Sequence, residues 1–332
     1  MNRKIVVIGS NSFSGASFVA YCLKQGLEIL GMSRSKEPAK AFLPYKWLSE
    51  KSRRSFKFQQ FDLNHDTLAM AKVIEKFHPL YVINFAAQSM VAESWQKPEH
   101  WYETNMVANV KLHDKIRHFE FLKKYIHVST PEVYGNCIGN VIETAAFNPS
   151  TPYAASRAAC DLHLRTFFNQ YKFPVSFTRA ANVYGPGQQL YRIIPRTIIF
   201  IKLGKKLKLH GGGVSKRSFV HIRDVAEATL KIAQNGVNGE TYHISTNSFI
   251  SIRKLVEMIF RMMGANFNDL VEISEERPGK DAAYLLDSSK IRNELGWKDN
   301  ISLEQGLAET IKWVSDNFSE IKNQPLNYIH KK

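Results

Sequence analysis

Short apolar segments alternate with amphipathic helical segments through the first half of the chain, and this alternation constrains the fold more than any other feature. The expected strands are residues 4–9, 27–34, 56–62, 81–87, 123–130 and 175–185. The helices expected between them are residues 14–26, 66–78, 101–119 and 153–169. Apolar strands separated by helices form parallel sheets with helices packed on both faces. The sequence therefore predicts an α/β fold, a Rossmann-like doubly wound parallel sheet with a smaller C-terminal substrate domain.

The pattern becomes less regular after Pro186, where shorter segments and the glycine run Gly211–Gly213 follow. We expect residues 1–185 to form a dinucleotide-binding Rossmann domain, to which later segments return. Residues 186–325 are expected to form mostly a substrate-binding domain, and residues 326–332 a frayed basic tail. A chain of 332 residues is long enough for roughly two such domains.

The strongly basic composition raises the question of a nucleic-acid partner. The formal net charge is +15, and basic clusters lie at residues 51–54, 202–208 and 330–332. None of them accompanies a helix-turn-helix, zinc-finger or aromatic RNA-binding pattern. We therefore expect no nucleic-acid partner, and we interpret the charge as suited to an anionic substrate or as a solvated surface.

The cysteines and the apolar runs bear on compartment and metal content. Cys22, Cys137 and Cys160 are far apart and form no CxxC pair, which argues against a disulfide framework and a zinc site. No apolar run reaches the roughly 18 residues that a membrane-spanning helix needs. We expect a cytoplasmic protein with no metal and no membrane partner.

The turn after the first strand is a candidate cofactor site, and it runs from Gly9 to Gly15 with the sequence GSNSFSG. Glycines let the backbone approach a pyrophosphate, and the start of the following helix offers amide donors and a favourable dipole. Ser12 stands where a middle glycine would help most, so an ordinary strand–helix turn is the alternative. The candidate cofactor residues in this turn are Gly9, Ser12, Phe13 and Gly15.

The ends of the next strands add further candidate cofactor residues. The second strand ends in Ser33 and Arg34, with no carboxylate to bind the adenosine ribose of NAD. An arginine and a serine suit a 2′-phosphate instead, so NADP is favoured, with NAD as the alternative. Asp62 and Leu63 close the third strand, where they are placed to meet the adenine. Ala86 follows the fourth strand, where a small side chain lets the cofactor backbone pass.

Four polar residues form the candidate catalytic group: Thr130, Glu132, Tyr153 and Arg157. Tyr153 and Arg157 are four residues apart in an expected helix and therefore share one face of it. Thr130 and Glu132 lie at the end of the expected strand 123–130, from which they can meet that face. Together the four offer a proton donor or acceptor for a sugar hydroxyl, a fixed positive charge and a second carboxylate base. Tyr153 and Arg157 also count as candidate cofactor residues; the alternatives are a packing tyrosine, a solvated carboxylate and a surface ion pair.

Several blocks of the sequence carry a resemblance to a known family. They are NFAAQSMV (84–91), TNMVANVKL (104–112), RAANVYGPGQ (179–188), RSFVHIRDVAEA (217–228) and RPGKDAAYLLDSSKI (277–291). With the residues above, their order and spacing resemble the extended short-chain dehydrogenase/reductase family over nearly the whole chain. Within that family the chain is similar to the nucleotide-sugar 4,6-dehydratases, the group that acts on dTDP-glucose and GDP-mannose.

The resemblance implies an NAD(P)-dependent lyase and a role for each catalytic candidate. Thr130 and Tyr153 would flank the sugar 4-hydroxyl, and the tyrosinate would take its proton while C4 gives hydride to the nicotinamide. Glu132 would remove the C5 proton, the 6-hydroxyl would leave as water, and hydride would return to C6. Glu132 favours elimination over epimerisation, because epimerases of this fold usually lack it. Decarboxylases of UDP-glucuronate also carry it, so an epimerase or a decarboxylase is the alternative enzyme.

Two residues depart from the family pattern. Pro131 stands where dehydratases commonly carry aspartate or serine, and aspartate there is the acid that helps water leave. Glu132 or a water would then have to serve in both roles. Arg157 replaces the family lysine that holds the nicotinamide ribose and lowers the tyrosine pKa; it keeps the charge but differs in length and shape. These departures keep open a non-catalytic protein that binds the dinucleotide or a nucleotide sugar.

The resemblance also implies a substrate site and a homodimer. The candidate residues for a nucleotide-diphosphate sugar are Ser89, Asn182, Arg192, His210, Arg217 and Arg277. Arg217 and Arg277 resemble diphosphate-binding arginines, and His210 lies where the family often stacks an aromatic residue on the base. The dimer is expected to form through the helix at 101–119 and the Tyr153 helix. The apolar residues expected to face the partner are Met106, Val110, Leu162 and Phe167.

Overall fold

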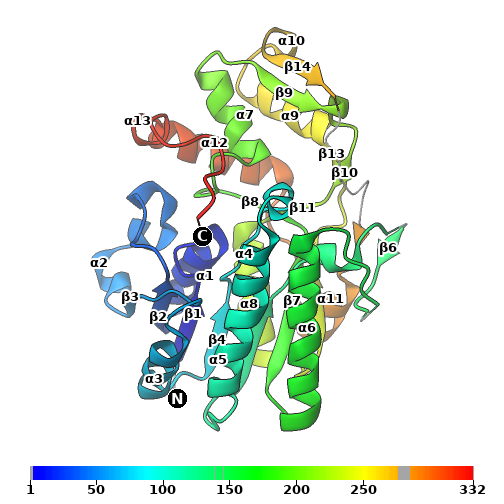
Figure 1. The fold of residues 1–332 in the computed structure, drawn as a ribbon. Coiled ribbons are helices and arrows are strands. Elements are labelled where there is room, and N and C mark those ends of the chain that lie inside the picture. Colours follow the sequence, from blue (N-terminus) through cyan, green and yellow to red (C-terminus); the bar gives the residue numbers. More distant parts are fainter. Residues whose placement is uncertain (1–2, 138, 145, 276–284, 332) are drawn as a thin grey trace.

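A seven-stranded parallel sheet forms the centre of the computed structural model, which describes residues 3–137, 139–144, 146–275 and 285–331 (Figure 1). The strand order is β12-β7-β5-β4-β1-β2-β3, and every neighbouring pair is parallel. The strand bounds are β1 Lys4–Ile8, β2 Glu28–Ser33, β3 Phe56–Gln60, β4 Tyr81–Asn84, β5 Lys124–Val128, β7 Val175–Ala180 and β12 Thr241–Ile244. This confirms the doubly wound parallel sheet predicted from the sequence.

Helices cover both faces of the sheet and create two hydrophobic cores. Their bounds are α1 Phe13–Lys24, α3 Thr67–Phe77, α5 Ala108–Ile116, α6 Pro152–Tyr171, α8 Ile222–Asn235 and α11 Ser289–Leu295. Ile5 and Val7 of β1 pack in the core that includes α1 and α8. Val6 and Ile8 of the same strand pack on the other face, in the core that includes α3, α5 and α6. A strand covered on both sides is apolar at consecutive positions, and this explains the continuous apolar run of β1.

A second lobe lies above the sheet in the view of Figure 1 and holds its own cores. Its elements are α7 Ile193–Lys202, β9 Leu207–His210, α9 Ile252–Met262, α10 Phe267–Leu270, β14 Val271–Ser274, α12 Leu303–Asp316 and α13 Phe318–Ile321. Shorter strands join the lobes: β6 Asn140–Val141, β8 Asn182–Tyr184, β10 Lys216–Arg217, β11 Phe219–His221, β13 Ile250–Ser251 and β15 Leu285–Leu286. The chain does not stay in this lobe after Pro186, because β12 returns to the central sheet beside β7 and α8 packs against α1.

The strand expected over residues 175–185 is wrong in one respect, because the structure divides it between two sheets. β7 belongs to the central sheet, whereas β8 pairs with β11 in a separate two-stranded sheet. The Ala181 amide still donates to the Ile244 carbonyl at 2.9 Å, but the next amide, of Asn182, donates to the Ser218 carbonyl at 3.1 Å. The backbone therefore changes its hydrogen-bonding partner between these two residues, and no glycine or proline marks this point in the sequence.

The helix expected over residues 101–119 is interrupted by a π-helical turn. α4 spans Pro98–Tyr102, the π turn spans Glu103–Val107, and α5 follows it. The Asn109 side-chain amide donates to the carbonyls of Thr104 and Asn105 at 3.0 and 3.2 Å. Such side-chain bonds to the backbone compete with the regular ladder, and this accounts for the wider turn. Within the described part of the chain, no helix is long and apolar enough to cross a bilayer.

Candidate active site

The turn between β1 and α1 is shaped for close approach to an anionic group. Gly9 has φ +81°, and a Cβ at this position would lie 2.7 Å from the Ala86 amide nitrogen. A Cβ on Gly15 would lie 2.2 Å from the Gly9 carbonyl oxygen. Ser12 is the N-cap of α1, and its Oγ accepts from the Gly15 amide at 3.1 Å. The turn therefore holds the start of α1, with its amide donors and positive dipole end, against the end of β4.

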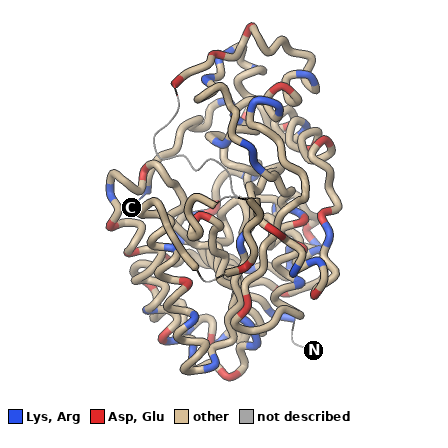
Figure 2. The backbone as a smooth tube through the Cα atoms, turned by 90° about the vertical axis from the view of Figure 1, so that its right-hand side faces the viewer, with Lys and Arg blue, Asp and Glu red and all other residues tan. Residues whose placement is uncertain are grey.

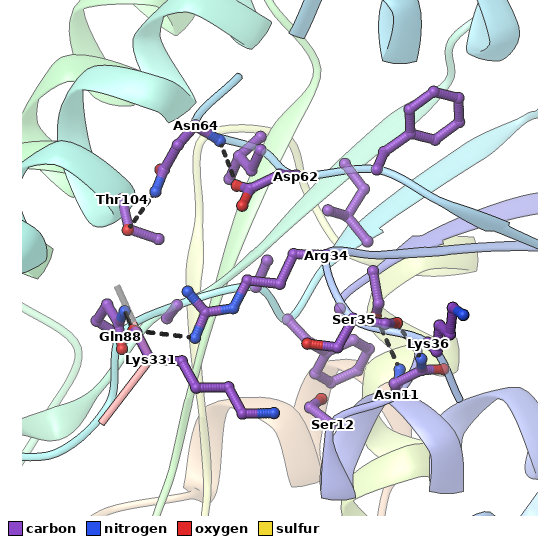
Figure 3. Close-up of a pocket in the computed structure, with 18 of the residues that line it drawn as sticks. Asn11, Ser12, Arg34, Ser35, Lys36, Asp62, Asn64, Gln88, Thr104 and Lys331 are labelled. Carbon is purple, nitrogen blue, oxygen red and sulfur yellow. Dashed lines mark hydrogen bonds between the residues drawn. The ribbon is translucent and has the colours of Figure 1, made fainter. Parts of the chain in front are cut away.

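A cavity of about 410 Å³ opens beside this turn, at the carboxyl ends of β1 to β4 (Figure 3). The predicted cofactor residues that line it are Gly9, Ser12, Ser33, Arg34, Asp62, Leu63 and Ala86. Phe13 does not line it, because its ring is buried in the core beneath α1 and serves packing. Three lining side chains are basic, Arg34, Lys36 and Lys331, against the single carboxylate of Asp62. This balance suits a ligand that carries phosphates.

Hydrogen bonds fix the strand ends that form the cavity wall. The Asn11 amide nitrogen donates to Ser33 Oγ at 3.0 Å, which ties the glycine turn to the end of β2. The Asn64 amide donates to Asp62 Oδ1 at 2.9 Å, and the Asn64 side chain donates to Thr104 Oγ1 at 3.2 Å. The wall is thus held by short polar contacts between residues that follow β1, β2 and β3.

Tyr153 is the centre of a second group of polar residues, close to the end of β5. It lies in the first turn of α6, which Thr151 caps by accepting from the Ala154 amide at 3.1 Å. Tyr153 is only 8% exposed, and this burial raises the pKa of its phenol. The positive charge of Arg157 acts in the opposite direction, as do a hydrogen bond from Thr130 and the charge of Arg192.

Glu132 acts on the same phenol, and its effect on the pKa is opposite in sign to that of Arg157. Its carboxylate raises the pKa of Tyr153, but this effect is smaller than the effects of burial and of Arg157. The Glu132 amide donates to Thr130 Oγ1 at 3.3 Å, so the two residues are held together at the start of the 3-10 turn Pro131–Tyr134. The structure therefore brings all four candidate catalytic residues together, from the end of β5 and the start of α6.

Arg157 is buried, and its contacts leave one donor for a ligand. Its guanidinium is 2% exposed; Nη2 donates to the Val128 carbonyl and lies 3.2 Å from His127 Nε2. Its Nη1 is also buried, and no described residue accepts a hydrogen bond from it. A buried donor without a partner is costly, so a ligand oxygen at this point would be stabilised.

A buried ion pair supports the floor of this group. Arg179 Nη2 lies 2.7 Å from Asp161 Oδ2, and both side chains are fully buried. The Ser129 hydroxyl donates to the same Asp161 oxygen at 2.7 Å, which ties α6 to the residue before Thr130. The ion pair joins α6 to β7, and the Ser129 hydrogen bond joins α6 to the residue that follows β5, so the two contacts hold α6 beside the end of β5.

Pro131 is favoured by the local backbone even though it cannot serve as an acid. It occupies the first position of the 3-10 turn, where an N–H has no partner within the turn. Its side chain is buried. The position therefore supplies shape to the turn and no proton donor, and the carboxylate nearest to it in sequence is that of Glu132.

The predicted substrate residues are more widely placed. Arg192 occupies the N-cap position of α7, and its charge lowers the pKa of the Tyr153 phenol. Asn182 Nδ2 donates to the Ser218 carbonyl at 3.3 Å, and Arg217 Nη1 donates to the Lys216 carbonyl at 2.8 Å. His210 lies at the end of β9, where Nδ1 is 2.8 Å from Ser274 Oγ.

Ser89 and Arg277 complete the set of predicted substrate residues. Ser89 is exposed after β4, next to the buried Gln88. Arg277 lies outside the described residues. Of the described substrate candidates, Arg192 is the one whose charge acts on the Tyr153 phenol.

Other cavity residues were missed by the sequence analysis. The polar ones are Asn11, Ser35, Lys36, Asn64, Gln88, Thr104 and Lys331. Asn64 and Gln88 follow β3 and β4, so their position at strand ends was a usable signal. Lys331 carried no such signal, because it reaches the cavity from the far end of the sequence. Among the described residues, no cluster of His, Cys, Asp and Glu side chains is arranged to hold a metal ion.

Comparison with known proteins places the chain among enzymes of nucleotide sugars. The sequence pattern of the family described as GDP-mannose 4,6 dehydratase matches residues 6–310. The human protein named dTDP-D-glucose 4,6-dehydratase is 32% identical over 278 residues, which cover 82% of this chain and 79% of that protein. The dTDP-glucose 4,6-dehydratase of Xanthomonas campestris pv. campestris is 29% identical, over 94% of this chain and 93% of its own length.

Solved structures agree with the sequence relatives. DesIV, a dTDP-glucose 4,6-dehydratase from Streptomyces venezuelae solved with NAD bound, superposes with a TM-score of 0.87 at 28% identity. The match covers 96% of this chain and 98% of that one. A UDP-glucose 4-epimerase from Thermotoga maritima superposes with a TM-score of 0.84 at 24% identity, which shows a shared fold.

Proposed function

Because the chain belongs to the GDP-mannose 4,6-dehydratase family, within the extended short-chain dehydrogenases/reductases, we propose that it is a nucleotide-sugar 4,6-dehydratase. The reaction is oxidation of the sugar at C4, elimination of water across C5 and C6, and reduction at C6. The observation that carries the proposal is the group around Tyr153, in which Thr130, Glu132 and Arg157 all act on one buried phenol. A group used only for packing would not need a carboxylate and a guanidinium at the same hydroxyl.

In this proposal Tyr153 takes the proton of the sugar 4-hydroxyl. A phenol in water has a pKa near 10, and burial raises it further here, so the tyrosinate needs help to form near neutral pH. Arg157 supplies that help through its positive charge, and Thr130 through its hydrogen bond. The hydroxyl of Thr130 also offers a second contact for the same sugar oxygen, so the two side chains hold C4 in place.

Glu132 is proposed as the base at C5. Oxidation at C4 acidifies the C5 proton, and a carboxylate beside Tyr153 is within reach of the neighbouring carbon. Because Pro131 offers no proton, Glu132 returns the proton that it took to the departing 6-hydroxyl, or a water delivers it. One carboxylate can serve both steps, since it becomes an acid once it has accepted the C5 proton. When hydride returns to C6, the Tyr153 phenol, which holds the proton of the 4-hydroxyl, or a water would supply the proton that C5 takes up.

The cofactor is a nicotinamide dinucleotide, which takes hydride from C4 and returns it to C6 when it is bound. We infer that NADP is preferred, with NAD as the alternative. Arg34 lines the cavity at the end of β2, and no carboxylate stands at that strand end to bind a free ribose 2′-hydroxyl. Gly9, Gly15 and Ser12 would hold the diphosphate, and the free Nη1 donor of Arg157 the nicotinamide ribose.

The substrate is proposed to be a nucleotide-diphosphate sugar held by the second lobe. Arg192 is placed to contact the sugar or its phosphate. Asn182 lies on β8, which pairs with β11, and Arg217 lies on β10, shortly before β11. Ser89, His210 and Arg277 are assigned here from the family resemblance alone. A homodimer and a cytoplasmic location are further parts of the proposal; exposed apolar side chains on α4 to α6, such as Leu162 at 50% exposure, support the dimer.

The test is turnover of a panel of GDP-mannose, dTDP-glucose, UDP-glucose, CDP-glucose and UDP-glucuronate, followed by mass spectrometry of the products. We expect one of these sugars to lose one water. A product of unchanged mass would point to an epimerase, and loss of carbon dioxide from UDP-glucuronate would point to a decarboxylase. Tyr153→Phe should be inactive, while Tyr171→Phe, a change of the half-exposed tyrosine at the end of the same helix, should keep activity.

A further inference from the structure

We propose that Lys331 binds the diphosphate of the dinucleotide, and that the segment Tyr328–Lys331, here called the strap, closes the cofactor cavity over it. The proposal rests on the proposed function, because it takes this cavity to be the dinucleotide site. Residues 326–332 are expected from the sequence to fray. The strap instead lies across the carboxyl end of the sheet and is held there by ring stacking and hydrogen bonds.

His330 anchors the strap on α4. Its ring stacks on the Trp101 indole, with ring centres 5.1 Å apart and planes within 7°. It also stacks on His100, and His330 Nε2 lies 2.8 Å from His100 Nδ1 in a ring-to-ring hydrogen bond. Trp101 is fully buried, so His330 covers a residue of the protein interior rather than a mobile surface.

Tyr328 fixes the strap to the second lobe. Its ring meets Tyr191 edge to face, with ring centres 5.6 Å apart, and Tyr191 directly precedes Arg192 at the start of α7. Its hydroxyl lies 3.2 Å from Nδ1 of His330. The strap therefore contacts α4 on one side and the approach to α7 on the other. It spans the two lobes, between which the dinucleotide and the sugar would meet.

Lys331 bridges two walls of the cavity through its carbonyl oxygen. Gln88 Nε2 donates to this oxygen at 2.7 Å, and Arg34 Nη2 donates to it at 3.3 Å. Gln88 follows β4, and Arg34 follows β2, so the two donors come from strands on opposite sides of β1. The strap thus joins the walls across the cavity that it helps to line.

The Lys331 side chain extends from this bridge into the cavity. Figure 3 shows it running toward Ser12, the N-cap of α1, where the helix presents its amide donors. A diphosphate at the helix start carries two negative charges, and the amides there supply only partial positive charge. An ammonium group that reaches the same point supplies the full charge that this turn otherwise lacks.

A strap of this kind matches the chemistry of the proposed reaction. The dinucleotide is reduced and then reoxidised within one turnover, so it ends each cycle in the state in which it began. The bound dinucleotide therefore need not be exchanged for a new one between turnovers. If the reduced dinucleotide dissociated before hydride returned to C6, the reaction would stop at the intermediate. A closure that slows dissociation favours completion of the cycle.

The experiment measures binding of NADP, NAD, ADP and adenosine to the purified protein, by calorimetry and without any sugar. Lys331→Ala should weaken NADP and NAD by a similar factor of about tenfold, since both carry the same diphosphate. It should weaken ADP as well and leave adenosine unchanged. Lys331→Arg should restore most of the affinity, and removal of residues 328–332 should speed release of the reduced dinucleotide by more than about tenfold. Lys322→Ala, a change of an exposed lysine directly after α13 and outside the strap, is the matched control.

Other outcomes overturn the proposal in distinguishable ways. If Lys331→Ala or removal of the strap leaves dinucleotide affinity unchanged or makes it tighter, the strap is a neutral or competing segment. A loss confined to NADP would assign Lys331 to the 2′-phosphate instead of the diphosphate. If the wild-type protein binds neither NADP nor NAD, the proposed function itself fails, and the strap proposal fails with it.

Discussion

The guanidinium of Arg157 lies one helical turn beyond the phenol of Tyr153 in α6, and its charge opposes the rise in pKa that burial imposes on that phenol. The family lysine would act on the tyrosine in the same direction, so the substitution preserves the sign of the effect. The contacts that hold the side chain are those of an arginine, because Nη2 of Arg157 donates to the Val128 carbonyl and lies against His127. A shorter, more mobile lysine ammonium would not need to make both contacts.

Replacing Arg157 tests this relationship through the pH dependence of turnover. Arg157→Met removes the charge, so the pKa of Tyr153 should rise and the rate near neutral pH should fall. Each unit of pKa lowers the tyrosinate fraction about tenfold. The rising part of the pH–rate profile should therefore move to higher pH. Arg157→Lys keeps the positive charge, so it should lower the turnover rate little or even raise it. An unchanged pH profile in Arg157→Met would show that the charge does not act on the phenol.

Glu132 and Tyr153 are predicted to act at different steps. Glu132→Gln should still oxidise C4, because Tyr153 and Thr130 are untouched, so reduced nicotinamide should accumulate without loss of water. Tyr153→Phe should block the earlier step, and no reduced nicotinamide should appear. Absorbance in the reduced-nicotinamide band and product mass report the two steps separately. Normal dehydration by Glu132→Gln would remove the carboxylate from the mechanism and favour an epimerase.

β1, β2 and β4 were predictable because most of their residues are apolar and buried, and such runs are distinctive when helices separate them. The prediction was wrong at residues 175–185, because no glycine or proline separates the part in β7 from the part in β8, which belong to two different sheets. Nothing in the composition marks Ala181 as the point of change, since the change depends on which carbonyls β12 and Ser218 present. The π turn at Glu103–Val107 was equally hidden, because it depends on where the Asn109 side chain finds acceptors.

The site was predictable where it obeys the geometry of parallel sheets. Ser33, Asp62 and Ala86 were identified because the carboxyl ends of parallel strands meet at one edge, and the cavity lies at that edge. Lys331 was not predictable, because it is 297 residues away in sequence from Arg34, whose side chain contacts its carbonyl. No local pattern indicates such a contact; it follows from the path of the chain through the second lobe.

Arg34 is predicted to set the choice of dinucleotide. Arg34→Asp should lower the preference for NADP over NAD by more than tenfold, about 1.4 kcal/mol, because a carboxylate repels the 2′-phosphate and accepts from a ribose hydroxyl. Titration of both dinucleotides into wild type and variant measures the ratio. Arg53→Asp, on the exposed α2 (Glu50–Arg53), makes the same charge change away from the cavity and should leave the ratio intact. A wild-type protein that co-purifies only with NAD would contradict the prediction.

Leu162 is predicted to lie in the dimer interface. It is 50% exposed on α6, and Val107, in the π turn before α5, is 39% exposed. Leu162→Glu should shift the protein toward a monomer, since a charge in an apolar interface must be desolvated. Light scattering at micromolar concentration measures the mass. Leu68→Glu, at a leucine 57% exposed on α3, is the control and should leave the dimer intact; a wild-type monomer would refute the prediction.

The last prediction concerns stability in acid, where buried histidines must be kept neutral. Burial lowers the pKa of His221 to about 3, with Arg223 as a smaller cause, although the Glu309 carboxylate lies 3.7 Å from Nε2 and would favour the charged ring. Burial outweighs that contact because the ring is only 1% exposed. His221 also caps α8, where Nδ1 accepts from the Arg223 amide at 3.3 Å, and a protonated ring would lose this acceptor.

The sign follows from comparing the folded and unfolded states. In the unfolded chain a histidine has a pKa of about 6.5, so below that pH the unfolded state takes up a proton that the folded state refuses. The stability from the neutral His221 is complete above pH ~6.5 and is lost as pH falls toward 3, at about 1.4 kcal/mol per pH unit. His221→Asn keeps a capping side chain and cannot be protonated. Urea unfolding at pH 7.5 and 5.5 should therefore show a loss of stability that is smaller in His221→Asn by about 1.4 kcal/mol. The exposed His118→Gln should lose as much as wild type, and an equal loss in His221→Asn would mean that His221 is protonated in the folded protein.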